Sequence, residues 1–137
     1  MDQRLFFLLN MARHKVFQHV DAEAEKQLGV PVTQVAALLF LTKNEGCPQK
    51  ELGKALGLNK PAVSGLVGRM QKHGLIARHQ SESDGRAWCL FMTDKGREVL
   101  PLVPPLLGQL NSRLTDGFDE AELEVVQRFL NTAILRF

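Results

Sequence analysis

Residues 59–93 read NKPAVSGLVGRMQKHGLIARHQSESDGRAWCLFMT, and they contain the clearest structural signals of the chain. Its first part, from Asn59 to about His73, predicts an amphipathic helix. Apolar side chains recur there at helical spacing and indicate one buried stripe, made of Val63, Leu66, Val67 and Met70. Asn59 is a good N-cap because its side-chain oxygen can accept a hydrogen bond from a backbone N–H of the first turn. Gly74 is expected to end the helix, as a glycine just beyond a helix usually does.

The opposite face of this helix is small, polar and basic. It carries Pro61, Ser64, Gly65, Gly68 and Lys72. The two glycines destabilise the helix by roughly 1 kcal/mol each relative to alanine. A helix tolerates that penalty more readily where another molecule must approach its backbone closely. This face is therefore a candidate binding surface.

A β-hairpin is expected after the helix. One strand should span Leu75 to His79 and a second Arg86 to Met92, with the turn-forming pair Asp84-Gly85 between them. Thr93 is placed to cap the next helix. Helix, strand, basic-tipped hairpin and strand is the layout of a winged helix. In that fold the helix lies in the DNA major groove, and the hairpin reaches the adjacent backbone or minor groove.

The hairpin residues 84–93, DGRAWCLFMT, resemble the wing signature of the MarR family of bacterial transcription regulators. That signature has an aspartate, an arginine two residues later, and alternating aliphatic residues up to a threonine. Met92 stands where the family prefers leucine. KPAVS at 60–64 and KHGLI at 72–76 also resemble the family's recognition-helix stretch. The resemblance spans the whole chain, because the helices on both sides follow the family's order.

The resemblance implies a mainly α fold with a small β-hairpin wing, a winged helix-turn-helix with N- and C-terminal dimerisation helices. The chain of 137 residues is enough for one domain with its own core. Residues 1–137 are thus predicted to form a single MarR-like domain. Residues 1–30 and 98–137 would supply the dimerisation helices, and residues 31–97 the DNA-binding part.

The helices before the recognition helix have weaker boundary signals. The first is expected from about Asp2 to Leu28. Thr33 is the expected N-cap of a second, almost wholly apolar helix that belongs at the centre of the domain. A third, short helix should begin at about Pro48, and its cap is either Cys47 or a weaker one.

Two signals mark the C-terminal helices. The family usually has one long helix after Thr93, but Pro101, Pro104 and Pro105 predict a bend, whose position the sequence leaves open. Asp119 and Glu122 resemble a capping box for the last helix.

The terminal helical regions carry more large apolar side chains than one chain can cover, among them Phe6, Phe7, Phe17, Phe129, Ile134 and Phe137. Large exposed apolar patches usually mark an interface. In the MarR family the first and last helices interlock into a two-fold dimer, so a homodimer is expected. The alternative is that these helices pack only within one chain.

The net charge of +2 is spread unevenly. Residues 48–97 hold nine Lys and Arg against four Asp and Glu, a net +5, and the remainder of the chain is net −3. A basic patch confined to one module is typical of a surface that binds phosphates. A solvated basic face would give the same count.

We therefore expect a sequence-specific regulator that binds a pseudo-palindromic site in double-stranded DNA, and a repressor in particular. The expected DNA contacts are Asn59, Lys60, Pro61, Ser64, Gly65, Gly68, Arg69, Lys72 and Arg86. For Arg69 the sequence leaves two roles open, which are a phosphate contact and an internal ion pair. Arg86 is the expected wing contact, and Asp84 is expected to orient it rather than to touch DNA. The alternative function is a winged-helix protein-interaction module that does not bind DNA.

Other kinds of chemistry are not indicated. The four histidines lack metal-ligand spacing, and neither a phosphate-binding glycine loop nor a nucleophile elbow is found, so we expect no enzyme, cofactor or metal ion. Cys47 and Cys89 do not suggest a disulfide framework. No apolar run approaches the ~20 residues of a membrane span, and the start does not read as a signal peptide, so a cytoplasmic protein is expected.

A small-molecule effector is a further expectation from the resemblance. MarR-like proteins often bind small aromatic or phenolic ligands between the dimer helices and the DNA-reading part, and then release DNA. His14, Phe17 and Phe40 would line that crevice here. The alternative is that these three are ordinary core and surface residues.

Overall fold

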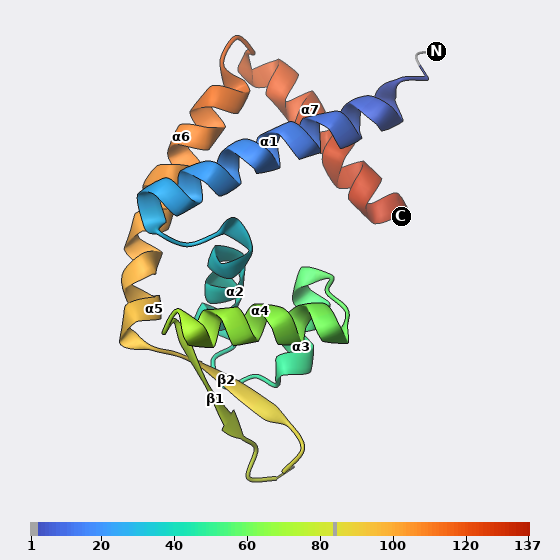
Figure 1. The fold of residues 1–137 in the computed structure, drawn as a ribbon. Coiled ribbons are helices and arrows are strands. Elements are labelled where there is room, and N and C mark those ends of the chain that lie inside the picture. The colour runs from blue at the N-terminus through green and yellow to red at the C-terminus, as the bar shows by residue number, and fades with distance from the viewer. Residues whose placement is uncertain (1–2, 84) are drawn as a thin grey trace. The chain divides into compact units, whose positions relative to one another are not determined.

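The computed structural model describes residues 3–83 and 85–137. This part of the chain is mainly helical, with one two-stranded antiparallel sheet (Figure 1). Its elements in order are α1 (Leu5–Leu28), α2 (Val32–Lys43), α3 (Gln49–Leu56), α4 (Lys60–Lys72), β1 (Ile76–Gln80), β2 (Trp88–Met92), α5 (Asp94–Val99), the 3₁₀ turn η1 (Leu100–Leu102), α6 (Val103–Thr115) and α7 (Glu120–Arg136). The chain divides into two units, the first ending at Leu106 and the second running from Leu107 to Phe137. Among the described residues, no helix combines the length and the apolar character that crossing a membrane would require.

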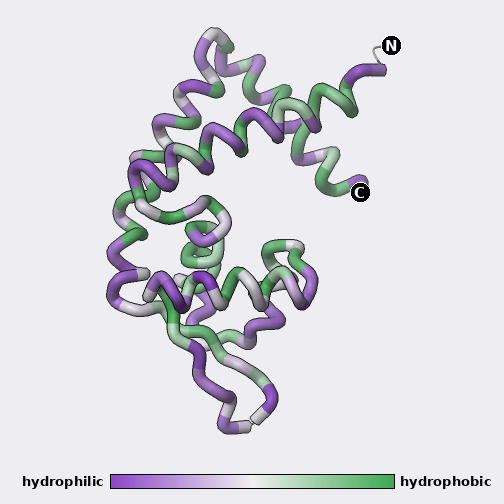
Figure 2. The backbone as a smooth tube through the Cα atoms, viewed as in Figure 1, coloured by the Kyte–Doolittle hydropathy of each residue, from purple (hydrophilic) through white to green (hydrophobic). Residues whose placement is uncertain are grey.

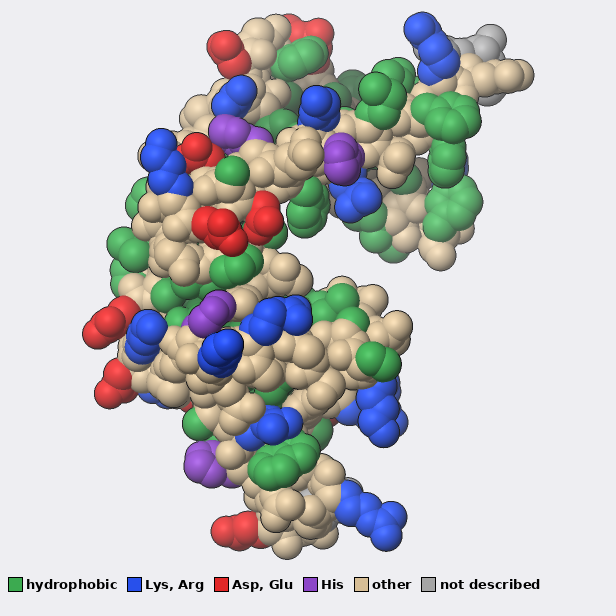
Figure 3. Space-filling view, viewed as in Figure 1, with side chains coloured by type: hydrophobic (Ala, Val, Ile, Leu, Met, Phe, Trp, Pro, Cys, Tyr) green, Lys and Arg blue, Asp and Glu red, His purple; other side chains and the backbone are tan. Residues whose placement is uncertain are grey.

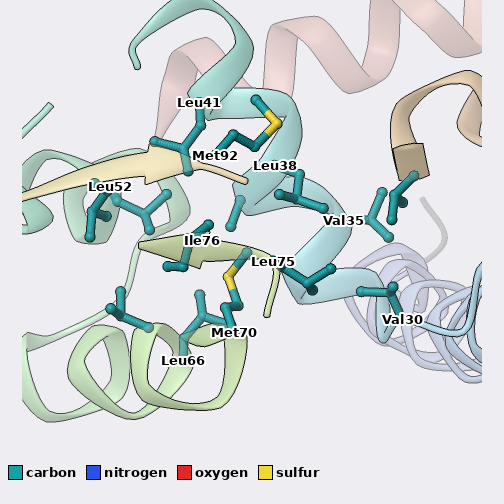
Figure 4. Close-up of a cluster of buried hydrophobic side chains, with 14 of the residues drawn as sticks. Val30, Val35, Leu38, Leu41, Leu52, Leu66, Met70, Leu75, Ile76 and Met92 are labelled. Carbon is teal, nitrogen blue, oxygen red and sulfur yellow. The ribbon is translucent and has the colours of Figure 1, made fainter. Parts of the chain in front are cut away.

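The core of the first unit is built around α2, whose Val35, Ala37, Leu38 and Leu41 are buried. Figure 2 colours the backbone by hydropathy and shows hydrophobic and hydrophilic residues interleaved along the helices. Leu38 and Leu41 of α2 are fully buried. Leu66 and Met70 of α4 are buried on the other side of the hairpin stem, where Ile76 lies between the layers (Figure 4). Fully burying a leucine stabilises a fold by about 1.5–3 kcal/mol, so this cluster holds the recognition helix in place. The predicted apolar stripe of that helix is confirmed throughout.

The sheet is a hairpin whose strands begin slightly later than predicted. Ile76 lies opposite Met92, and Gln80 lies opposite Trp88. The second strand starts at Trp88 rather than at Arg86, and just beyond its start the Ser81 N–H donates to the Ala87 carbonyl at 2.9 Å. Alternation of side chains predicts which face a residue occupies, but not where the pairing stops.

The predicted cap of α2 was wrong, whereas for α3 the weaker start that the sequence left open is the one observed. Helix α2 begins at Val32, ahead of Thr33, and Pro31 at its N-cap makes no side-chain cap. The Val32 N–H instead donates to the Asp21 carboxylate of α1 at 3.0 Å. Negative charge is favourable at a helix N-terminus, so this bond both caps α2 and joins it to α1. Helix α3 likewise begins after Pro48 without a side-chain cap.

Cys47 is excluded as the α3 cap because it belongs to the sheet. Its carbonyl accepts a hydrogen bond from the Leu90 N–H at 3.0 Å, and the neighbouring Gly46 N–H donates to the Leu90 carbonyl at 2.7 Å. Pro48 also forms a bridge with Cys89. The segment before α3 therefore pairs with the free edge of β2 and ties the wing to the helix-turn-helix.

The bend predicted by the prolines falls at η1. Helix α5 ends at Val99, and α6 begins at Val103. Pro101 lies within the 3₁₀ turn, and Pro104 and Pro105 occupy the first turn of α6. Their missing N–H groups are tolerated there, because a first helical turn has no intrahelical partners for those groups.

The second unit consists of the rest of α6 and of α7, joined by a turn at Gly117, whose φ is +86°. The predicted capping box is confirmed: the Glu122 N–H donates to Asp119 at 2.8 Å, and the Asp119 N–H donates to Glu122 at 3.0 Å. Helix α7 is described throughout, and none of its residues is buried in the single chain. Phe129, Ile134 and the terminal Phe137 are exposed.

Candidate nucleic-acid interface

Helix α4 is positioned by its cap and by its buried stripe. The Asn59 side-chain oxygen accepts a hydrogen bond from the Ala62 N–H at 2.9 Å, as predicted. This leaves the amide N–H groups of Asn59 available as donors. The predicted contact face is turned to solvent, with Lys60, Pro61, Ser64, Gly68 and Lys72 exposed and Gly65 half-buried.

The two glycines of α4 differ in their surroundings. At Gly68 a methyl group would meet no atom within 4 Å, so the backbone there is open to an approaching molecule. At Gly65 the same methyl would lie 3.2 Å from Nη1 of Arg69, whose guanidinium therefore extends over the helix backbone. Arg69 is exposed, and its partners among the described residues include no carboxylate. The internal ion pair considered for Arg69 is thus not formed within that part of the chain.

The C-terminal end of α4 is held by contacts that the sequence did not predict. Gln34 of α2 is only 2% exposed, and its Oε1 lies 3.2 Å from Nδ1 of His73. Lys95 donates through Nζ to the His73 carbonyl at 2.7 Å, which places a positive charge at the negative end of the helix dipole. Gly74 then turns the chain with a φ of +75°, as predicted.

The base of the wing is joined to both flanking helices. Thr93 caps α5, as predicted, and its hydroxyl also donates to the Gly74 carbonyl at 2.6 Å. The Glu45 carboxylate accepts a hydrogen bond from the Met92 N–H at 3.1 Å and one from Arg97 at 2.7 Å. The wing is therefore anchored at the end of α4 and at the start of α5. Glu45 was missed because its partners lie about fifty residues away along the chain.

The wing carries two residues of the predicted site, and the structure describes one of them. Arg86 is exposed beside the turn. Asp84, the residue expected to orient it, lies outside the described residues. A second arginine, Arg78 of β1, lies with its guanidinium carbon 4.7 Å from the centroid of the Trp88 ring. Sequence reasoning passed over Arg78, because its position relative to Trp88 depends on the strand register.

The surface over these elements is basic. Figure 3 shows Lys and Arg side chains gathered over α4 and along the hairpin, with few acidic side chains among them on the face in view. Cationic side chains around an exposed helix face and beside a protruding hairpin suit the phosphates of a duplex.

Comparison with known proteins gives a matching family. The model of the MarR family matches residues 28–87, which run from the end of α1 to the start of the second strand and include the helix-turn-helix. Over these residues the chain matches the MarR family.

The relatives of this chain are named as transcription regulators. The chain is 33% identical over 111 residues to the transcriptional repressor MprA of Escherichia coli K12, an alignment that covers 77% of this chain and 62% of MprA. It is 32% identical over 120 residues to the regulator TtmR of Methylorubrum extorquens, covering 85% and 60% respectively. The chain thus spans less than two thirds of the length of these curated relatives.

A solved MarR-type structure matches over nearly the full chain. The repressor CouR bound to a 23-mer DNA duplex shares 27% sequence identity with this chain, at a TM-score of 0.84. The match covers 95% of this chain and 92% of CouR. The winged helix-turn-helix fold predicted from the sequence is therefore confirmed.

Cys47 and Cys89 are both free cysteines. Cys47 is buried, and burial, followed by the nearby charge of Glu51 and the neighbouring Cys89, raises the pKa of its thiol above the ordinary value of 9.0. Because Pro48 lies opposite Cys89, the preceding Cys47 points to the other face of the sheet.

The residues suggested for an effector crevice are not joined by the described contacts. His14 is exposed on α1, and Phe17 is 53% exposed, with the Arg13 guanidinium carbon 5.8 Å from its ring centroid. Phe40 of α2 instead packs half-buried against the core. The crevice stays a prediction.

Proposed function

We propose that this chain is a dimeric, sequence-specific regulator that binds double-stranded DNA through α4 and the wing, and that it acts as a repressor. The observation that carries the proposal is the exposed face of α4, which is small and basic and is bordered by an arginine-bearing hairpin. The relation to CouR, which was solved on a DNA duplex, supports the same conclusion.

The residues of α4 divide by what they offer to DNA. Lys60, Arg69 and Lys72 provide positive charge for backbone phosphates, which sets affinity and register. Ser64 provides a hydroxyl for a base edge, and the bare backbone at Gly68 lets the helix approach the groove floor. Affinity and specificity would therefore depend on different side chains of one helix.

The wing would complete the contact on the neighbouring groove. Arg86 is exposed near the tip of the hairpin. An arginine guanidinium suits a narrow minor groove, whose negative potential attracts it. Asp84 keeps its proposed role of orienting Arg86.

A second copy of the chain is the proposed partner of the terminal helices. Phe6 and Phe7 of α1 are 75% and 64% exposed, and Ile134 of α7 is 74% exposed. An isolated chain would leave these side chains in water. A two-fold dimer removes such surface from solvent and places two recognition helices on one duplex.

The alternative is a winged helix that binds another protein and not DNA. That function gives no reason for positive side chains around an exposed helix face that holds two glycines. The chemistry of α4 therefore favours DNA. A small aromatic effector in contact with His14, Phe17 and Phe40 stays a secondary proposal that rests on the family resemblance.

The test is selection of a duplex from a random pool by the purified protein, followed by footprinting of the selected site. Lys72→Glu should abolish binding, because it reverses a charge on α4. Lys26→Glu makes the same change on α1 and serves as the matched control, since it should leave binding within a few-fold of wild type. Failure of the wild-type protein to enrich any sequence would contradict the proposed function.

A further inference from the structure

A cationic side chain lies on the side of the wing that faces the recognition helix. In the hairpin register, Arg78 and Trp88 share a face with Leu90 and Met92, because successive residues of a strand alternate between faces. Leu90 and Met92 are buried in the core that includes α4. Arg78 and Trp88 continue this face beyond the core, towards the wing tip.

The Arg78 head group is held in place by the indole. Its guanidinium carbon lies 4.7 Å from the centroid of the Trp88 ring, within the range of a cation–π contact. A planar guanidinium stacked on an aromatic face loses little further freedom when it binds an anion. Trp88 itself is 38% exposed, so the stack lies at the surface of the protein.

The charge of Arg78 is not neutralised within the described part of the chain. No described carboxylate pairs with Arg78, and its buried Nε–H has no hydrogen-bond partner there. A fixed guanidinium with no internal anion is suited to an external one.

We propose that Arg78, stacked on Trp88, is an additional DNA-binding residue that contacts a backbone phosphate between the site of α4 and the site of the wing tip. The inference rests on the proposed function. Lys72 at the end of α4 and Arg86 near the wing tip lie before and after it in the chain, and both are exposed. When a helix and a wing enter neighbouring grooves of a duplex, the DNA backbone between them presents phosphates. A guanidinium can donate two parallel hydrogen bonds to phosphate oxygens.

The experiment measures affinity against salt concentration for a fluorescein-labelled duplex selected from a random pool by the wild-type protein. Arg78→Gln should weaken binding and lower the slope of log affinity against log salt by about 0.9 per protomer, or about 2 for a dimer. Arg78→Lys should restore the slope, because it keeps the charge. Trp88→Leu should weaken binding at an unchanged slope, because it removes the positioning ring only. Lys26→Gln on α1 is the control for the loss of one charge and should change neither quantity.

Trp88 supplies a second readout that needs no variant. It is the one tryptophan of the sequence, which contains no tyrosine, so the intrinsic fluorescence reports on the stack directly. Its emission maximum should shift to shorter wavelength when the selected duplex binds, because DNA removes water from the ring. Emission that stays unchanged on binding would place the stack outside the interface and overturn the inference.

The outcomes separate this inference from the function on which it rests. A wild-type protein that selects no duplex overturns both. A wild-type protein that binds, together with an Arg78→Gln protein of unchanged salt slope, overturns the role of Arg78 alone. A slope that Arg78→Lys fails to restore would show that Arg78 supports the hairpin structurally and does not contact phosphate.

Discussion

Arg86 and Ser64 represent the two parts of the candidate interface at the scale of single residues. Arg86 is a charge near the wing tip, whereas Ser64 is an uncharged hydroxyl on the exposed face of α4. Arg86→Ala should weaken binding to most sequences and lower the salt slope by about 1 per contact, or about 2 for a dimer. Ser64→Ala should leave the slope unchanged and reduce discrimination among operator variants.

The measurement is a salt titration of the selected duplex and of a scrambled duplex, for the wild type and both variants. Unchanged affinity of Arg86→Ala would remove the wing tip from the mechanism. If the Ser64→Ala protein keeps full discrimination among operator variants, the Ser64 hydroxyl makes only a packing or phosphate contact. The two results are independent, since one concerns charge and the other base recognition.

At Gly68, one substitution should change the stability of α4 and its binding to DNA in opposite directions. A methyl group there would meet open space, and alanine favours a helix over glycine by about 1 kcal/mol. Gly68→Ala should therefore raise the melting temperature and weaken DNA binding, because the added methyl holds the helix away from the groove. Thermal melts and binding titrations of the same preparation check this. Affinity equal to wild type would mean that DNA does not approach the helix at Gly68.

At the scale of elements, the recognition helix depends on contacts from helices that do not touch DNA in the proposed complex. Gln34 holds the His73 ring at the end of α4, and Glu45 joins the wing strand to α5. Helix α2 is itself joined to α1 through Asp21. These bonds connect the terminal helix α1, through α2, to the orientation of α4.

The Asp21 cap gives a test at this scale. Asp21→Ala should reduce the free energy of unfolding by about 1 kcal/mol, because the Val32 N–H loses its partner at a helix N-terminus. Urea denaturation monitored by circular dichroism measures the change. Glu25→Ala alters an exposed carboxylate of the same helix and should stay within about 0.5 kcal/mol of wild type. Equal effects of the two substitutions would contradict the capping role.

At the scale of the whole molecule, association is expected to be linked to folding. None of the residues of α7 is buried in the single chain, and the helix carries apolar side chains along its length. Deleting residues 124–137 should give an insoluble or unfolded chain, because the dimer surface would be lost. Sedimentation and thermal melting check the result. A soluble monomer that melts cooperatively would show that the terminal helices are not needed for folding.

Two-fold symmetry also constrains the DNA site. A dimer that places both recognition helices on one face of a duplex requires half-site centres about one helical turn, or ~10 bp, apart. Footprinting of the selected site at single-nucleotide resolution should therefore give a pseudo-palindromic pattern. Protection of one asymmetric half-site would contradict symmetric binding.

Features that depend on neighbours a few residues apart could be predicted from the sequence alone. The Asn59 cap, the apolar stripe of α4, the Gly74 turn and the capping box of Asp119 with Glu122 were all predicted and are all present. Each is satisfied within about one turn of helix, so the local residue pattern contains the necessary information. The winged-helix order follows from the same kind of signal.

Contacts that join distant residues became apparent only in the folded chain. Asp21 rather than Thr33 caps α2, Cys47 pairs with β2, and Arg78 lies against Trp88. In each case the partner is brought close by packing or by strand register, and no short motif encodes it. The physical reason is that a hydrogen bond or a stacking contact depends on distance in space, which a linear pattern specifies only within one element.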